Sequence, residues 1–244
     1  MGESDGRMRL RLTSHRVAGH GLRLGRVLSA GPMLRNTLLH PPRPQVGVLS
    51  ANRADLLRLG ALFRLAATSP HSAVHVPAPP GAPAQSFGYV DNPAVPLLLA
   101  REDTGLRPSD WPDVRRRMRR DAAPLTVTAP APRSIDRPAD VRRRADHRPA
   151  RFTEHAGTAV ITARPELLFW MGDWLTAGGD AVARDRDIHR HGQTLVADLA
   201  GFFDPLNTDD PMHALCVMAV DPIFHKARWH KRRRLREEAA APRT

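Results

Sequence analysis

The sequence predicts an α/β fold in which a largely parallel sheet is flanked by helices, with a basic flexible arm at the N-terminus and a basic helix at the C-terminus. Three observations support this prediction. Residues 46–67 have the pattern of a strand followed by a helix, residues 158–176 repeat that order, and shorter strand-like runs alternate with helical patterns between them. Strands that alternate with helices are typical of parallel sheets.

The predicted organisation is one domain with basic ends. Residues 1–45 are predicted to form a Gly- and Pro-rich basic arm, residues 46–224 a single α/β domain, and residues 225–244 a basic helix and tail. Within the domain, residues 77–96 predict a Pro-rich loop and residues 130–151 an Arg- and Pro-rich linker. A chain of 244 residues is long enough to bury a substantial core.

The first strand and helix have the clearest pattern in the chain. The apolar run 46–49 ends at Ser50 and Asn52, and either side chain can accept a hydrogen bond from the free N–H groups of a helix. Asp55 adds a carboxylate in the first turn, where the helix dipole favours negative charge. The following turns are apolar around most of the helix, so we expect neighbours on two of its faces.

The second strand and helix resemble the first. Residues 160–168 match residues 48–57 with one gap, sharing two aliphatic residues, a hydroxyl residue, Ala, Arg, and an acid before Leu-Leu. Internal duplication and convergence of two similar units both account for a match this short. The second helix is predicted over 165–176 and is expected to stop at Gly178 and Gly179.

The remaining predicted elements are shorter. They are strands at 73–76, 95–100 and 125–128, a helix capped by Ser109 or Asp110 with Val114 and Met118 on its inner face, and a helix over 193–203. Residues 214–220 fit a strand or a buried helical turn equally well, because periodicity does not separate the two in a short apolar run.

The net charge of +12 and the pI of about 11.4 favour a polyanionic partner such as DNA or RNA. Almost all of the positive charge is Arg, because Lys occurs only at Lys226 and Lys231, and GC-rich coding produces the same bias. Cys216 is the single cysteine, so no disulfide framework forms within the chain. No apolar run approaches the roughly 18 residues of a membrane span, and we expect a bacterial cytoplasmic protein.

The C-terminal segment has the strongest functional pattern, because its cations are interleaved with an aromatic residue and contain no acid. The residues predicted to bind nucleic acid are Lys226, Arg228, Trp229, Lys231, Arg232, Arg233, Arg234 and Arg236. Cations along a helix can neutralise successive phosphates, while Trp229 stacks on an exposed base. An anionic membrane surface and a solvated tail balanced by acids are the alternatives. The favoured function is nucleic-acid binding by an accessory or regulatory protein, mainly through phosphate contacts.

The alternative function is an α/β enzyme or ligand-binding protein that acts on a small anionic substrate at the carboxyl ends of the strands. The candidate residues follow predicted strands and are Ser50, Asn52, Arg53, Glu102, Asp103 and Arg164. Arg53 and Arg164 are suited to clamp a phosphate or carboxylate, and Glu102 or Asp103 to act as a general base. Helix capping and ion pairs at the sheet rim explain the same residues, since no Gly-rich phosphate loop or nucleophile elbow accompanies them.

One segment has residue types that bind metals. Asp185, Asp187, His189 and His191 alternate along the chain. In a helix the two Asp–His pairs face opposite sides, and in a strand only neighbouring residues reach one ion. We therefore predict no metal site and no cofactor, and interpret 185–191 as a polar surface loop.

Overall fold

The structure is a computed structural model of the whole chain. The residues that it describes are 7–17, 23–31, 34, 37–41, 47–79, 85–87, 90–118, 120–133, 149–182, 193–199, 202–203 and 215–220. The predicted C-terminal basic helix and the segment 185–191 lie outside the described residues, and the predicted linker is described only at its two ends.

Short strands and three helices make up the described fold. The strands are β1 (Met8–Arg16), β2 (Arg26–Ser29), β3 (Leu38–His40), β4 (Gly47–Ala51), β5 (Ser72–Val76), β6 (Gln85–Phe87), β7 (Val90–Asn92), β8 (Leu97–Arg101), β9 (Ala122–Ala129), β10 (Arg151–His155), β11 (Thr158–Ala163), β12 (Gln193–Asp198) and β13 (Leu215–Val220). The helices are α1 (Arg53–Thr68), α2 (Trp111–Met118) and α4 (Pro165–Val182), with 3-10 turns η2 (Glu102–Thr104) and η3 (Pro108–Asp110).

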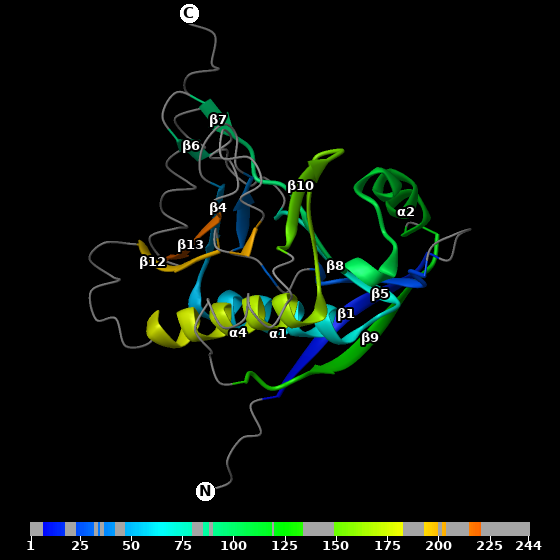
Figure 1. Cartoon of the computed structure of the whole chain (residues 1–244), viewed down its shortest axis with the longest axis horizontal. Coiled ribbons are helices and arrows are strands. Elements are labelled where there is room, and N and C mark those ends of the chain that lie inside the picture. Colours follow the sequence, from blue (N-terminus) through cyan, green and yellow to red (C-terminus); the bar gives the residue numbers. More distant parts are fainter. Residues whose placement is uncertain are drawn as a thin grey trace, which may run out of the picture.

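The strands form a seven-stranded sheet in the order β10-β11-β8-β5-β2-β1-β9, a four-stranded sheet in the order β12-β13-β4-β3, and the pair β6-β7 (Figure 1). The α/β class is confirmed, but the prediction of a largely parallel sheet is wrong. Among the named strands of the described residues, only β2–β5, β8–β11 and β4–β13 pair in parallel. Successive strands such as β3–β4 and β10–β11 pair directly, and direct return of the chain makes such pairs antiparallel.

The N-terminal region contributes strands to both sheets. β1 and β2 lie inside the seven-stranded sheet, and β3 pairs with β4. The prediction of a flexible arm over residues 1–45 is therefore not confirmed in this part of the chain. In β1, Leu10 and Leu12 are buried while Arg9 and Arg11 are exposed, which is the alternation expected of a strand with one covered face.

The chain contains two units with the same topology. Each unit has a pair of antiparallel strands, a helix, and a second pair of antiparallel strands. The first unit is β3-β4-α1-β5-β8, and the second is β10-β11-α4-β12-β13. The resemblance found in the sequence extends to the fold and needs no gap, because Val48 corresponds to Val160 and Gly60 to Gly172.

The two units exchange strands between the sheets. The first unit places β3 and β4 in the four-stranded sheet and β5 and β8 in the seven-stranded sheet, whereas the second unit does the reverse. The parallel pairs β4–β13 and β8–β11 each join a strand of the first unit to a strand of the second. Each long helix therefore connects the two sheets, and neither half of the chain completes a sheet alone.

α1 and α4 lie side by side against the sheets, as Figure 1 shows. Their closest approach is at Gly60 and Gly172, where a Cβ added to either glycine would lie 2.6 Å from the carbonyl oxygen of the other. Real Cβ atoms do not come so close, so both positions require glycine. The expectation that α1 has neighbours on two faces is confirmed by its burial between α4 and the strands.

Two apolar clusters cover opposite faces of the seven-stranded sheet. The larger cluster contains α1, α4 and inward residues such as Leu10, Leu99 and Ile161. The smaller cluster lies beneath α2 and contains Trp111 and Val160. Because adjacent strand residues point to opposite faces, Val160 and Ile161 belong to different clusters.

One predicted boundary and one predicted element type are wrong for tertiary reasons. α4 continues through Gly178 and Gly179 to Val182, because these glycines allow close packing: an added Cβ would lie 3.2 Å from Val196 and 3.0 Å from Leu57, respectively. The predicted helix over 193–203 is the strand β12, which pairs with β13. The ambiguous run 214–220 is the strand β13.

Candidate functional site

The candidate site lies where β8 and β11 end. These strands pair in parallel, with Arg101 opposite Ala163, so their carboxyl ends meet at one edge of the seven-stranded sheet. Side chains from the turn after β8 and from the β10–β11 pair converge there. In α/β proteins this edge is the usual place for a ligand.

The turn after β8 is held by its own side chains. Arg101 forms an ion pair with Asp103, and its Nη1 donates to the carbonyl oxygen of Ala67 at the end of α1 (3.1 Å). The buried Thr104 hydroxyl donates to the Arg101 carbonyl oxygen at 2.6 Å. Gly105 then has a φ of +71°, in the left-handed region that glycine adopts without strain. This compact turn fixes one wall of the site.

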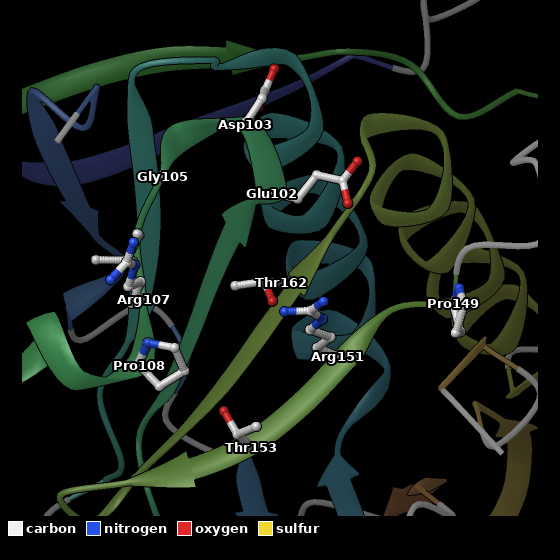
Figure 2. Close-up of a pocket in the computed structure, with 10 residues that line it drawn as sticks. Glu102, Asp103, Gly105, Arg107, Pro108, Pro149, Arg151, Thr153 and Thr162 are labelled. Atoms are coloured by element: carbon white, nitrogen blue, oxygen red, sulfur yellow. The ribbon is translucent and has the colours of Figure 1, made fainter. Parts of the chain in front are cut away.

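A cavity of about 700 Å³ opens at this edge. We call it the strand-end pocket. Its lining residues are Glu102, Asp103, Gly105, Leu106, Arg107, Pro108, Pro149, Arg151, Thr153 and Thr162. Figure 2 shows the Arg151 side chain beside Thr162, with Glu102 on the side toward the β8 turn and Arg107 on the opposite wall. The volume is in the range of small-molecule sites in proteins.

In the strand-end pocket both acidic side chains lie near arginines, whereas the Arg151 side chain has no counter-charge among the described residues. Asp103 is held by Arg101, and Glu102 lies 4.0 Å from Nε of Arg164. The Arg151 side chain forms no hydrogen bond or ion pair with a described residue. A guanidinium with free donors can bind a carboxylate or phosphate through two parallel hydrogen bonds. The pocket therefore offers Arg151 for an anion and threonine hydroxyls for polar groups nearby.

The structure divides the six predicted ligand-binding residues between the two sheets. Glu102, Asp103 and Arg164 lie together at the strand-end pocket or beside it. Ser50 lies in β4, and Asn52 and Arg53 follow this strand, which belongs to the four-stranded sheet. They line no part of this pocket.

Ser50, Asn52 and Arg53 have structural roles, which were the alternative to ligand binding. Asn52 Oδ1 accepts a hydrogen bond from the Asp55 backbone N–H at 2.8 Å, so Asn52 caps α1. Ser50 is buried, and the exposed Arg53 lies 3.8 Å from Asp180 of α4. The predicted clamp of a ligand between Arg53 and Arg164 therefore has no counterpart at the strand-end pocket.

Arg107, Arg151 and Thr153 belong to the site but were not predicted. Arg151 and Thr153 alternate along β10 with the buried Phe152 between them, which is the pattern of a half-covered strand. That alternation is the sequence signal from which β10 could have been predicted. The Arg- and Pro-rich composition before it instead favours a linker up to residue 151.

A second polar group is buried between the two long helices. Arg64 Nη1 donates to Asp173 Oδ1 at 3.3 Å, to the Gly172 carbonyl oxygen at 3.1 Å and to the Thr176 hydroxyl at 2.7 Å. Burial raises the pKa of Asp173 to about 6, against the opposing effects of the Arg133 backbone N–H and of Arg64. Burial also lowers the pKa of Arg64. Because the Arg64 and Asp173 side chains are only 2% and 3% exposed, this pair joins the helices rather than binding a ligand.

A partly buried histidine lies on the other face of the sheet. His75 of β5 is 5.4 Å from the Trp111 ring, centroid to centroid, and its Nδ1 is 3.4 Å from the Ser29 hydroxyl. Burial, with smaller contributions from the nearby His15 and Arg115, lowers the pKa of His75 to about 4. His75 is therefore neutral at physiological pH and packs against Trp111 beneath α2.

In the described residues, no group of three or more His, Cys, Asp or Glu side chains is arranged to hold a metal ion. None of the helices in the described ranges is long and apolar enough to cross a membrane. Comparison with known proteins gives no significant match to a family model, a curated protein or a solved structure.

Proposed function

We propose that the protein binds a small anionic compound, carrying a phosphate or carboxylate group, in the strand-end pocket. The observation that carries this proposal is the position of the Arg151 side chain, which lines a cavity of about 700 Å³ and has no hydrogen-bond or ion-pair partner among the described residues. A guanidinium at the rim of a pocket is suited to bidentate recognition of an anion. Arg107 adds a second positive charge on the opposite wall.

The neighbouring groups limit what the ligand carries besides its anion. Glu102 and Asp103 lie on one side, and both accept hydrogen bonds when ionised. Thr153 and Thr162 provide hydroxyl groups beside Arg151. A compound with one anionic group and several hydroxyl or amino groups, such as a phosphorylated sugar or a hydroxy acid, matches this distribution.

The test is a thermal-shift screen of the full chain against inorganic phosphate, phosphosugars, nucleotides and hydroxy acids. A ligand at a hundred times its Kd stabilises the protein by about 2.7 kcal/mol. For a chain of this length we expect a rise in Tm of about 5 to 10 °C. Arg151→Ala should abolish the rise.

The matched control is Arg53→Ala, which removes an exposed arginine from the other sheet and should retain the full rise. The proposal is wrong if no compound raises the Tm of the wild-type protein. It is equally wrong if Arg151→Ala responds to every compound as the wild-type protein does.

Binding of DNA or RNA is the second candidate function, supported by the cations between Lys226 and Arg236 and by Arg115 and Arg116, which are exposed on α2. Contacts of this kind are made mainly to phosphates and depend steeply on salt. Fluorescence anisotropy of labelled DNA over a range of salt concentrations measures them.

Replacement of Lys231, Arg232 and Arg233 by Gln in the full chain should reduce the slope of log K against log salt by about 2.7, at about 0.9 per cation. The control replaces Arg142, Arg143 and Arg144 by Gln, which changes the net charge equally. An equal reduction of the slope in the two variants would mean that binding depends on the net charge of the chain and not on the C-terminal cations in particular.

A further inference from the structure

β9 is the outermost strand of the seven-stranded sheet. It pairs with β1 from Ala122 opposite His15 to Ala129 opposite Met8, and no described strand pairs with its other side. Figure 1 shows β9 along the outer side of β1. The outward backbone N–H and C=O groups of such a strand are free to pair with an additional strand.

β9 lacks most of the features that protect strand edges. Natural edge strands carry charged side chains, are very short or contain bulges. β9 has eight residues, no charged residue and a regular register with β1. Pro124 is its one protective residue. Since proline has no N–H, it occupies an edge position whose nitrogen faces outward, and Thr126 and Thr128 share that alternation.

Two arginines lie one strand inside this edge. Arg9 is opposite Thr128 and Arg11 is opposite Thr126, and all four residues are exposed. Neither arginine forms an ion pair with a described residue. The other face of β9 is fixed, because Leu125 and Val127 pack against the main core.

We propose that the free edge of β9 binds an extended segment of a partner protein in which alternate residues are Asp or Glu. A strand added to β9 lies about 4.8 Å from it, with alternate side chains beside Thr126 and Thr128. The threonines are short, so the carboxylates of the added strand reach across them toward Arg9 and Arg11. Backbone pairing supplies affinity, and the two arginines select the acidic pattern.

Charge argues against the other occupants. A second copy bound through the same edge would place no carboxylate near Arg9 and Arg11, because β9 has no charged residue. Nucleic acid would gain phosphate contacts with Arg9 and Arg11, but its bases would find no exposed aromatic side chain of the described residues to stack on at this face. In the described part of the chain, the exposed large hydrophobic side chain is Leu195, which lies on the four-stranded sheet.

The experiment measures binding of fluorescein-labelled peptides to the full chain by anisotropy. One peptide alternates Glu with Thr, a second has the same composition with the Glu residues in one block, and a third is the alternating peptide N-methylated at every second residue. We expect the alternating peptide to bind at least about tenfold more tightly than the block peptide. N-methylation removes the backbone donors of one edge and should abolish binding.

The variant Arg9→Glu/Arg11→Glu tests the arginines, and it should weaken binding of the alternating peptide about tenfold or more. The control is Arg16→Glu/Arg26→Glu, which makes the same change in net charge at exposed positions on the other face of β1 and β2. This control should change the affinity less than about threefold. Circular dichroism of both variants establishes that each is folded.

Three results would overturn the proposal. The first is equal affinity for the alternating and block peptides, which means unspecific attraction of charge. The second is equal loss of binding in the two double variants. The third is that the protein binds double-stranded DNA but neither peptide, and that this binding depends on Arg9 and Arg11. Such a result would mean that this face binds nucleic acid.

Discussion

Gly60 of α1 and Gly172 of α4 occupy corresponding positions in the two units, and each lies against the backbone of the other helix. This reciprocal contact places the crossing of the helices at the same point in both units. Because α1 and α4 each connect the two sheets, the crossing also sets how the sheets face one another. The contact is therefore the centre of the fold, although it contributes no functional group.

Replacement of Gly60 by Ala should destabilise the protein strongly. The added Cβ would lie 2.3 Å from the Thr176 hydroxyl and 2.6 Å from the Gly172 carbonyl oxygen, so the helices must separate. We expect a loss of about 3 kcal/mol in the free energy of unfolding, measured by urea denaturation. Gly25→Ala is the control, since its nearest neighbour is the His71 carbonyl oxygen at 3.8 Å. A similar loss in both variants would contradict the close packing of α1 against α4.

The Arg64–Asp173 pair should show strong coupling in a double-mutant cycle. Arg64→Met and Asp173→Asn each leave one partner buried without its counter-charge, and each should cost about 3 to 5 kcal/mol. The double variant buries no unpaired charge, so its cost should be well below the sum of the two. The measurement is urea unfolding of all four proteins. Additive costs would mean that the two side chains do not interact.

Protonation of His75 should destabilise the protein in mild acid. Its pKa is about 4 in the folded state and 6.5 in the unfolded chain, so the unfolded state binds more protons between these values. The stabilising contribution is complete above about pH 6.5 and falls by about 3 kcal/mol as the pH approaches 4. His75→Phe keeps an aromatic ring near Trp111 and should show a correspondingly smaller loss in urea unfolding from pH 7 to pH 4.5.

The comparison isolates His75 because the other titrating groups are common to both proteins. Asp173 has a raised pKa of about 6, so it acts in the opposite direction over part of the same range and cancels in the difference. His15 and Arg115, whose charges act on His75, are also retained. Identical pH profiles for the wild-type and His75→Phe proteins would contradict the lowered pKa of this histidine.

Asn52→Ala should lower the free energy of unfolding by about 1 kcal/mol, because the Asp55 N–H loses its acceptor. The same variant should leave the thermal shift produced by a ligand of the strand-end pocket unchanged. Together the two readouts separate a helix cap from a ligand contact. Loss of the ligand-induced thermal shift without loss of stability would mean that Asn52 contacts the ligand and does not act as a helix cap.

Local pattern predicted the parts of the fold that local contacts determine. The strand before α1 and the buried face of α2 were predicted correctly, because each depends on side chains within one or two turns. The cap of α1 is Asn52, one of the two residues, Ser50 and Asn52, that the sequence offered. Half of the predicted ligand-binding residues lie at or beside the strand-end pocket, because strand ends that carry charge can be identified without knowing their neighbours.

The sequence by itself determined two similar strand–helix units and their apolar faces, and it limited the cap of α1 to Ser50 or Asn52. Only the tertiary structure decided which strands pair, because the alternation of buried residues in β4 or β11 does not specify a partner. It also decided that Gly178 and Gly179 continue α4 and that residues 193–198 form a strand, since both depend on contacts distant in the chain. The strand-end pocket has the same origin: Glu102 and Arg151 share it because the two units exchange strands between their sheets.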